Sequence, residues 1–453
     1  MIRKHMLFRL LLACLALGIP VMASADYAAY DITMQPGSSE VELNFTWLTT
    51  SELTGNEELL IGTDSYIATC SVAEEADTEG EESTDIFSCQ VSSVAVEKST
   101  SYSYRIGDGV DYTDAVSVET QDAQNYNFIF VGDPQIGSSG ETEDDAKGWA
   151  TTVTTALTAF PDTSFIMSAG DQVNTANSSS EYDGFFTAAE LATTPFAPAI
   201  GNHDEDDLYS SHFNIPNVSA DYGTSEQYSG GDYWFSYGDT LFMVLNTNID
   251  DNSTHETFIE ETIAANPDAR WKVLVYHHSI FSSASHVADV NGTRTALYPI
   301  IDENDIDVVL SGHDHFYART YQLSGGEIVE DGASYSSFDR RTQSDITAYV
   351  DLVDEAVVEV DSKTVGRTVV VDPEGTVYFT ANSASGSKYY DFNEIDGYTN
   401  YYFAMYEQLK TPTYLNIDVD NYSLTVSAYR TDTGEQLDSY TIVKSREGRH
   451  SYE

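Results

Sequence analysis

The stretch Phe128-Ile129-Phe130-Val131-Gly132-Asp133-Pro134-Gln135 decides the fold, because an apolar run is followed directly by a polar cluster that begins with glycine. The same pattern occurs three more times. The apolar runs 165–167, 196–200 and 308–310 precede Gly170-Asp171-Gln172, Gly201-Asn202-His203-Asp204 and Gly312-His313-Asp314-His315. Each run has the length and composition of a buried strand, so each polar cluster is predicted to lie where a strand ends. Active sites form at such strand ends in layered α/β folds.

Around these segments the sequence alternates between predicted strands and helices from about Gln121 onward. After an acidic first turn, one helical face carries Trp149, Val153, Ala156, Leu157 and Phe160. Further strands are predicted at 240–245, 271–276 and 307–310, with helices around 254–265 and 295–303. We therefore expect an α/β layered domain at 122–445, completed by strands at 376–380 and 414–429. The polar, acidic segment 325–372 is interpreted as an insertion.

Residues 26–121 are predicted to form an all-β sandwich, because apolar and polar side chains alternate strictly from Val41 to Trp47. Two cysteines, Cys70 and Cys89, lie in this part of the chain and flank an acidic run at 74–82. A disulfide between them is the favoured interpretation, and two separate buried thiols are the alternative.

Residues 1–25 have the features of a secretory signal peptide. Basic residues at 3–4 precede an apolar stretch at 6–22, which ends in the small-residue pattern Ala23-Ser24-Ala25. The stretch is shorter than a membrane-spanning helix and contains Gly18-Ile19-Pro20, which argues against a membrane anchor. We therefore expect a secreted or cell-surface protein without a membrane span.

The chain carries 74 acidic and 20 basic residues, a net charge of −54. Such a charge repels a nucleic-acid backbone, so duplex DNA is excluded as a partner. An anionic substrate must then be attracted locally, and bound cations are the expected means. The sequence gives no signal for the oligomeric state.

The polar clusters together offer the ligand types that a pair of divalent metal ions requires. A dinuclear site needs a bridging carboxylate, further oxygen donors and several imidazole nitrogens. The chain supplies them at successive strand ends: Asp133, Gln135, Asp171, Asn202, His277 or His278, His313 and His315. One ligand type alone would be weak evidence, but the ordered set indicates a metal site.

These blocks, in this order, resemble the calcineurin-like metallophosphoesterases. The segments Pro36-Gly37-Ser38 and Tyr102-Ser103-Tyr104-Arg105-Ile106-Gly107 resemble the sandwich that precedes the catalytic domain of purple acid phosphatases. The resemblance implies a four-layer α/β/β/α metallophosphoesterase domain preceded by a fibronectin III-like sandwich.

The resemblance also implies a role for each matching residue. Asp171 would bridge the two metals, and the other ligands would be Asp133, Gln135 and His315 on one metal and Asn202, His277 and His313 on the other. His277 is favoured over His278 because it matches the first histidine after the strand in the family. His286, nine residues further on, agrees with this choice, because it matches a substrate-contacting histidine of the family. His203 would act beside the substrate, with Asp204 orienting it. Arg319, His212 and His255 are interpreted as structural or surface residues.

Two positions depart from the family pattern. Asn174 stands where purple acid phosphatases have a metal-ligating tyrosine, so ferric iron and the purple colour are not implied. Gln135 stands where most metallophosphoesterases have a histidine ligand, and its amide oxygen is a harder donor. The expected cofactors are therefore two divalent ions, Mn²⁺, Fe²⁺ or Zn²⁺, with Ca²⁺ possible.

The leading hypothesis is a secreted, metal-dependent hydrolase that cleaves small phosphomonoesters through a metal-bridging hydroxide. In this scheme His203 acts as a general acid or charge stabiliser and His286 contacts the phosphoryl group. A phosphodiesterase of the same fold is one alternative, and an exported binding protein with a vestigial site is the other.

Overall fold

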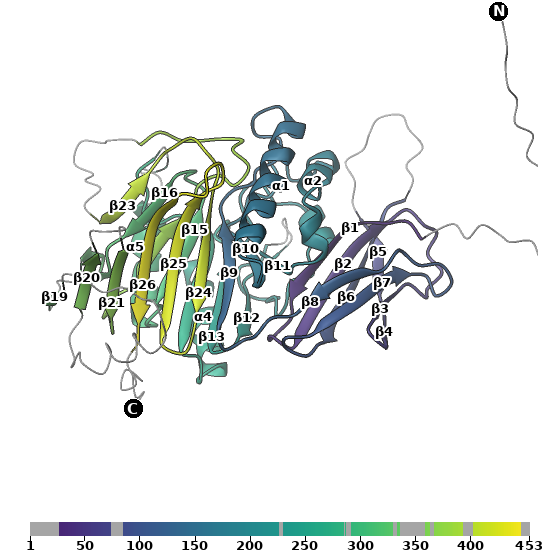
Figure 1. Cartoon of the computed structure of the whole chain (residues 1–453), viewed down its shortest axis with the longest axis horizontal. Helices are drawn as coiled ribbons and strands as arrows, with labels where there is room; N and C mark the ends of the chain where they lie inside the picture. Colours follow the sequence, from purple (N-terminus) through teal and green to yellow (C-terminus); the bar gives the residue numbers. More distant parts are fainter. Residues whose placement is uncertain are drawn as a thin grey trace, which may run out of the picture.

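The computed structural model describes residues 27–73, 85–225, 230–284, 286, 291–328, 333–335, 358–362, 367–392 and 402–444. In Figure 1 a β-sandwich built from the first part of the chain lies beside a larger α/β part. The signal-peptide prediction and most of the segment 325–372 lie outside the described residues. No helix within the described ranges is long and apolar enough to cross a membrane.

Two four-stranded sheets form the sandwich in the described part of the chain. One has the order β1 (Ala29–Pro36), β2 (Glu42–Thr49), β6 (Phe87–Ala95), β5 (Thr69–Val72), and the other β4 (Asp64–Ile67), β3 (Glu58–Ile61), β7 (Ser101–Gly107), β8 (Val116–Glu119). Phe45 from β2 packs edge-on against Tyr104 from β7, with 5.2 Å between their ring centroids. Cys70 in β5 and Cys89 in β6 form a disulfide, which confirms the predicted pair.

The α/β part contains two large sheets, called here the larger and the smaller sheet. Within the described residues the larger sheet has the order β11 (Phe196–Pro198), β10 (Thr163–Ser168), β9 (Tyr126–Val131), β24 (Thr413–Val419), β25 (Ser423–Arg430), β26 (Gln436–Val443), β21 (Arg367–Val371), β20 (Val358–Ser362), β19 (Ala333–Tyr335). The smaller sheet has the order β12 (Tyr233–Tyr237), β13 (Thr240–Leu245), β14 (Trp271–His278), β15 (Val308–Gly312), β22 (Val377–Thr380), β16 (Tyr317–Thr320), β23 (Phe403–Glu407). A short hairpin joins β17 (Leu323–Ser324) and β18 (Glu327–Ile328).

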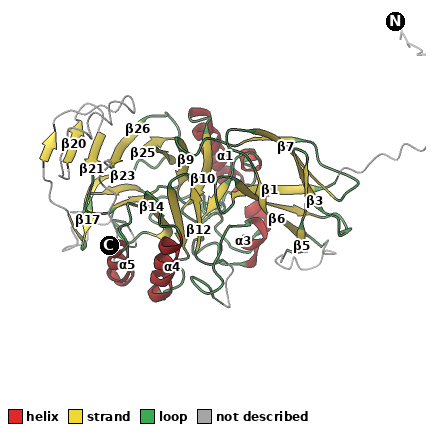
Figure 2. Ribbon diagram, turned by 90° about the horizontal axis from the view of Figure 1, so that it is seen from below, coloured by secondary structure: helices red, strands yellow, loops and turns green. Residues whose placement is uncertain are grey.

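Helices cover the outer faces of both sheets. The helices α1 (Thr142–Ala159), α2 (Ser179–Phe185) and α3 (Asp207–His212), with the 3₁₀ turn η1 (Ala189–Ala192), pack on the larger sheet. The helices α4 (Asn252–Ala265) and α5 (Asn291–Glu303) pack on the smaller sheet, on the opposite side of the molecule from α1 (Figure 2). The α/β/β/α fold class is thereby confirmed.

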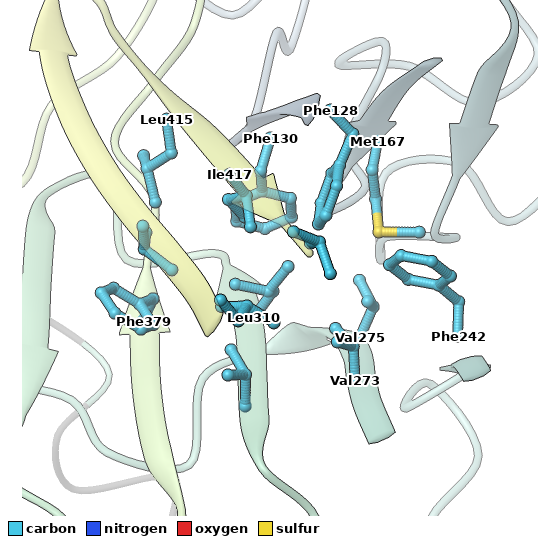
Figure 3. Packing of buried hydrophobic residues seen from close by; sticks show 14 of the residues in the cluster. Phe128, Phe130, Met167, Phe242, Val273, Val275, Leu310, Phe379, Leu415 and Ile417 are labelled. Atoms are coloured by element: carbon cyan, nitrogen blue, oxygen red, sulfur yellow. The ribbon is translucent and has the colours of Figure 1, made fainter. Parts of the chain in front are cut away.

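The main core lies between the two sheets. Alternate residues of β9 point to opposite faces, so Phe128 and Phe130 face the smaller sheet while Ile129 and Val131 face α1. Phe128 stacks on Phe165 with 4.9 Å between ring centroids, and the rows from both sheets meet in Figure 3. Since β9, β10, β14 and β15 are buried on both faces, they consist of nearly continuous apolar runs, as parallel strands do.

The first helix forms as its sequence predicts. Acidic residues occupy its first turn, where their negative charge interacts favourably with the positive end of the helix dipole. Trp149, Val153 and Ala156 are buried. The described strands of the segment 325–372 are β18 in the short hairpin and β19, β20 and β21, which extend the larger sheet at its far edge. Where it is described, the segment therefore contributes strands to the sheet.

The sandwich contacts the α/β part through side chains that donate hydrogen bonds to the backbone of α3 and of the residues that follow it. Asn44 Nδ2 donates to the carbonyl oxygen of Asn214 at 2.8 Å, and Ser88 Oγ donates to that of Ser211 at 2.7 Å. Asp31 lies 3.4 Å from Nε2 of His212 across the same boundary. His212 is therefore a buried contact between the two parts of the chain, which corrects its interpretation as a surface residue.

Candidate metal centre

Four strand ends meet where the two sheets meet. The parallel strands β9 and β10 end at Asp133 and Asp171, and the parallel strands β14 and β15 end at His277 and the cluster 313–315. The carboxyl ends of parallel strands lie at one edge of a sheet, so these side chains converge. The loop after β11 adds Asn202 from the next strand of the larger sheet.

One group of donor atoms consists of Asp133, Asp171 and His315, all buried. Each offers one ligand atom, and these atoms lie within 4.8 Å of one another. Nε2 of His315 lies 3.5 Å from Oδ1 of Asp133. The carboxylate of Asp133 also accepts the backbone N–H of His313 at 3.0 Å, which fixes its orientation.

A second group surrounds Nε2 of His277. Oδ1 of Asn202 and Nδ1 of His313 both lie 3.1 Å from this nitrogen, and Oδ2 of Asp171 lies 3.4 Å from it. His278 also lies close to His277 and His313, and its Nδ1 contacts Oγ1 of Thr247 at 2.8 Å. Asp171 thus contributes to both groups.

Gln135 provides a test of whether a cation fits these residues. Its side chain is fully buried, and its Nε2 donates to Oδ1 of Asn174 at 3.4 Å. Its Oε1 accepts no hydrogen bond from the described residues, although a buried unpaired oxygen is costly. A divalent cation accepts such an oxygen as a ligand, so the residues present fit the metals that the motifs imply.

The pKa of His277 also reflects the candidate ligand atoms that surround its ring. Its Nδ1 donates to the carbonyl oxygen of Ala169 at 3.0 Å, which leaves Nε2 to face the ligand group. Burial alone would lower the pKa of His277, but the charge and hydrogen bond of Asp171, and then the charge of Asp133, raise it to about 9. The same carboxylates that raise this pKa would attract a cation to the group.

Glycine precedes the ligands because the backbone and the carboxylates pack closely. A Cβ on Gly201 would lie 2.1 Å from Oδ1 of Asp171, and one on Gly312 would lie 2.7 Å from Oδ2 of Asp133. Several candidate ligands themselves have left-handed backbone angles, with φ of 38° at Gln135, 52° at Asp171, 70° at His313 and 50° at His315. Such angles are strained in residues other than glycine and are found at functional sites.

His203 lies beside the first carboxylates, and its position is fixed from two sides. Its backbone N–H donates to Oδ1 of Asp171 at 2.9 Å, and Nδ1 of its ring lies 2.6 Å from the carbonyl oxygen of Asn174. Asp204 does not orient this ring. Its carboxylate instead accepts the backbone N–H groups of Gln172 and Gly201, both at 2.9 Å, so it positions the loops that carry Asp171 and Asn202.

His286 lies at the same site, with its ring centroid 4.1 Å from that of His313. Its ring also meets Tyr390 edge-on at 5.4 Å. The structure thus brings all ten sequence-predicted site residues into one region at the edge of the two sheets.

Two supporting groups were missed by the sequence reasoning. His255 is buried and donates to the carboxylate of Asp232 at 2.7 Å, which corrects its interpretation as a surface residue. The loop after β22 was also missed, although Oγ of Ser383 donates to the carbonyl oxygen of Asp133 at 3.2 Å and the carbonyl oxygen of Lys388 lies 3.0 Å from Nδ1 of His315. A signal existed, because small polar residues follow the apolar strand Val377–Thr380 as they do at the other strand ends.

Arg319 has the structural role that was expected. Its Nε donates to Oδ2 of Asp438 at 2.7 Å, and Tyr317 donates to the same oxygen at 2.8 Å. This buried group joins β16 to β26 and lies away from the candidate ligands.

Comparisons with known proteins agree with this arrangement. Residues 126–317 match the model of the calcineurin-like phosphoesterase family. An uncharacterized protein of Mycobacterium tuberculosis is 27% identical over 29% of this chain and 29% of its own length. Purple acid phosphatase 17 of Arabidopsis thaliana is 43% identical over 10% of this chain and 14% of its own. The matched region therefore spans less than a third of these relatives.

Solved structures extend the likeness to most of the fold. A purple acid phosphatase from yellow lupin (Lupinus luteus) seeds superposes with a TM-score of 0.70 at 15% identity, covering 93% of this chain and 75% of that one. The structure of PhoD superposes with a TM-score of 0.55 at 11% identity, covering 93% and 95%. At these identities the likeness concerns the fold alone.

The layered fold and the two adjoining groups of candidate ligands match what a metallophosphoesterase domain contains. Residues 126–317 form a calcineurin-like phosphoesterase domain.

Proposed function

We propose that this chain is a secreted phosphoesterase that uses two divalent metal ions to hydrolyse small phosphomonoesters. The observation that carries the proposal is the convergence of three donor atoms on Nε2 of His277, next to a second group that shares Asp171 with the first. Two ligand groups with a common carboxylate are the arrangement that a dinuclear centre requires.

One metal would be held by Asp133, Gln135, Asp171 and His315, and the other by Asp171, Asn202, His277 and His313. When bound, the ions would neutralise phosphoryl charge and lower the pKa of a water molecule that attacks phosphorus. Mn²⁺, Fe²⁺ and Zn²⁺ are the proposed metals, with Ca²⁺ as a further candidate, because the amide oxygen of Gln135 is a hard donor. Since position 174 is Asn, no phenolate is available to favour ferric iron.

The chain's own residues would then bind the substrate and supply a proton. The contact of Nδ1 of His203 with the carbonyl oxygen of Asn174 requires a proton on Nδ1 and orients the ring. When the ring is an imidazolium, Nε2 also carries a proton, which it would donate to the leaving alkoxide or use to stabilise its charge. His286, whose ring lies tilted against that of His313, would contact a phosphoryl oxygen. Asp204 would contribute by holding the loops rather than by orienting His203.

Export is proposed from the signal-peptide pattern at 1–25 together with the disulfide between Cys70 and Cys89. Disulfides form and persist outside the reducing cytosol. Mass spectrometry of the mature protein should give an N-terminus close to residue 26. An intact residue 1 in exported material would contradict the cleavage prediction.

The function is tested by metal analysis followed by turnover of p-nitrophenyl phosphate and bis(p-nitrophenyl) phosphate. Asp171→Asn and His313→Ala should lose metal-dependent activity, whereas Asp391→Asn, which changes an exposed carboxylate, should keep it. Activity retained in either ligand variant would refute the site. Faster turnover of the diester would favour the phosphodiesterase alternative. An empty site and no activity after Mn²⁺ or Zn²⁺ is added would favour a binding protein with a vestigial site.

A further inference from the structure

The loop after β22 brings a lysine to the candidate metal centre. The carbonyl oxygen of Lys388 lies 3.0 Å from Nδ1 of His315, so the backbone of the loop is fixed against a proposed ligand. The side chain of Lys388 extends over Tyr390, with Nζ 4.9 Å from the ring centroid. A cation above an aromatic face at this distance is attracted by the ring, which holds the ammonium in place.

Tyr390 connects this ammonium to two histidines of the site. Its ring lies 5.1 Å from that of His315 and 5.4 Å from that of His286, the residue proposed to contact the phosphoryl group. The ammonium is therefore within about 10 Å of the His315 ring, which is close to one Debye length at physiological salt.

The charge of Lys388 is not neutralised by any carboxylate in the described ranges of the chain. Lys98, Lys410 and Lys444, by contrast, form ion pairs with Glu40, Asp391 and Asp307. The side chain is half-buried, so its field is less screened than that of an exposed lysine.

We propose that Lys388, held against Tyr390, is a substrate-binding residue that favours phosphoryl groups with two negative charges over diesters with one. This inference rests on the proposed phosphoesterase site and assigns the substrate class that the site prefers. A phosphomonoester above its second pKa of about 6 is a dianion, and a diester is a monoanion.

The size of the effect follows from the charges. Coulomb energy is proportional to the product of the charges, so at equal distance a dianion interacts twice as strongly with Lys388 as a monoanion does. Removal of the ammonium should then weaken dianion binding by the square of the factor for a monoanion. For an ammonium within about 10 Å of the His315 ring in a partly solvated site, we expect about threefold for a diester and about tenfold for a monoester.

The test compares Lys388→Gln, Lys388→Arg and Lys410→Gln in the full chain loaded with Mn²⁺, at pH 8 and low salt. Lys410 is the matched control, because it is an exposed lysine that pairs with Asp391 and has no contact with the candidate ligands. The measurements are KM and kcat for p-nitrophenyl phosphate and bis(p-nitrophenyl) phosphate, together with the binding of inorganic phosphate by calorimetry.

Lys388→Gln should raise KM about tenfold for the monoester and about threefold for the diester, with kcat little changed, and should weaken phosphate binding about tenfold. Lys388→Arg should keep the KM values and the phosphate affinity near those of the wild type, and Lys410→Gln should change neither quantity. Equal losses for the two esters, no loss, or the same loss in Lys410→Gln would overturn the inference. If the wild type binds phosphate but hydrolyses neither ester, the proposed function fails, and phosphate binding to Lys388→Gln still decides the role of Lys388.

Discussion

Replacement of Gln135 by methionine should change the stability of the protein in opposite directions with and without metal. In the metal-free protein, Oε1 of Gln135 is buried without a hydrogen-bond donor, and such a group costs about 1–3 kcal/mol. Methionine has a similar volume and no such oxygen. The substitution also removes the 3.4 Å contact with Asn174, which is worth at most about 1 kcal/mol and leaves a half-buried amide that water can reach. We therefore expect a net gain of about 1 kcal/mol in the free energy of unfolding without metal.

With metal bound, the sign should reverse. Mutation of a residue that only hydrogen-bonds to a metal ligand lowers metal affinity 10–100-fold, or by about 1.4–2.7 kcal/mol. Loss of a ligand oxygen itself should weaken metal binding at least as much. At saturating metal this loss appears directly in the unfolding free energy. Each kcal/mol corresponds to about 2–4 °C in Tm for a domain of 150–250 residues, so both changes are measurable.

The assay is thermal unfolding of wild type and Gln135→Met, once with a chelator and once with Mn²⁺. Gln322→Met is the matched control, because Gln322 is also buried and its Oε1 is also unpaired, while its Nε2 donates to Tyr440 at 2.8 Å. The control should leave the metal-induced rise in Tm unchanged. If Gln135→Met leaves that rise unchanged as well, or lowers Tm in the chelator, the reasoning about a ligand oxygen is wrong.

Three further predictions follow from the site and the sandwich. His277 has a raised pKa of about 9 without metal, so metal binding must displace its proton. The apparent dissociation constant of the metal should therefore fall about tenfold per pH unit from pH 7 to 9 and level off above pH 9. Calorimetry in buffers of different ionisation enthalpy checks this, and a flat pH profile would contradict it. Asp204→Asn replaces one of two acceptor oxygens with an N–H donor that faces a backbone N–H, so Tm should fall by several degrees and metal affinity should weaken. An unchanged metal titration would contradict the role of Asp204 in holding the loops. Cys70→Ser together with Cys89→Ser should destabilise the sandwich by about 2–4 kcal/mol in chemical denaturation while turnover per folded molecule is kept, and loss of turnover in the folded protein would mean that the sandwich shapes the site.

The strands that carry the site could be predicted because they are buried on both faces. A strand in such a position needs apolar residues on both sides, so 128–131 and 308–310 are continuous apolar runs that no surface element would contain. Within each sheet, the carboxyl ends of these strands lie together because parallel strands end at the same edge of a sheet. The approach of Asn202 to His277 depends on how the two sheets pack, which the pattern of one strand does not encode.

The roles of single polar residues were harder to predict. Asp204 is adjacent to His203 in sequence, yet its carboxylate binds backbone N–H groups from two loops, a choice set by backbone geometry. His255 was misjudged although a signal was present, because with Phe258 and Ile259 it lies on the buried face of α4 at helical spacing. Histidine is compatible with both water and a buried ion pair, so its identity alone does not decide between them.

The left-handed backbone at four of the proposed ligands bears on how this site is inherited. Glycine would adopt the φ angles at Gln135, Asp171, His313 and His315 with less strain, and a chain selected only for stability would drift towards it. Asp, Gln and His hold these angles at a cost in backbone strain, which is expected where the chemistry of the side chain is needed. A descendant that no longer used cations would be expected to relax first at these four positions, which makes them the places to look for lost activity among relatives.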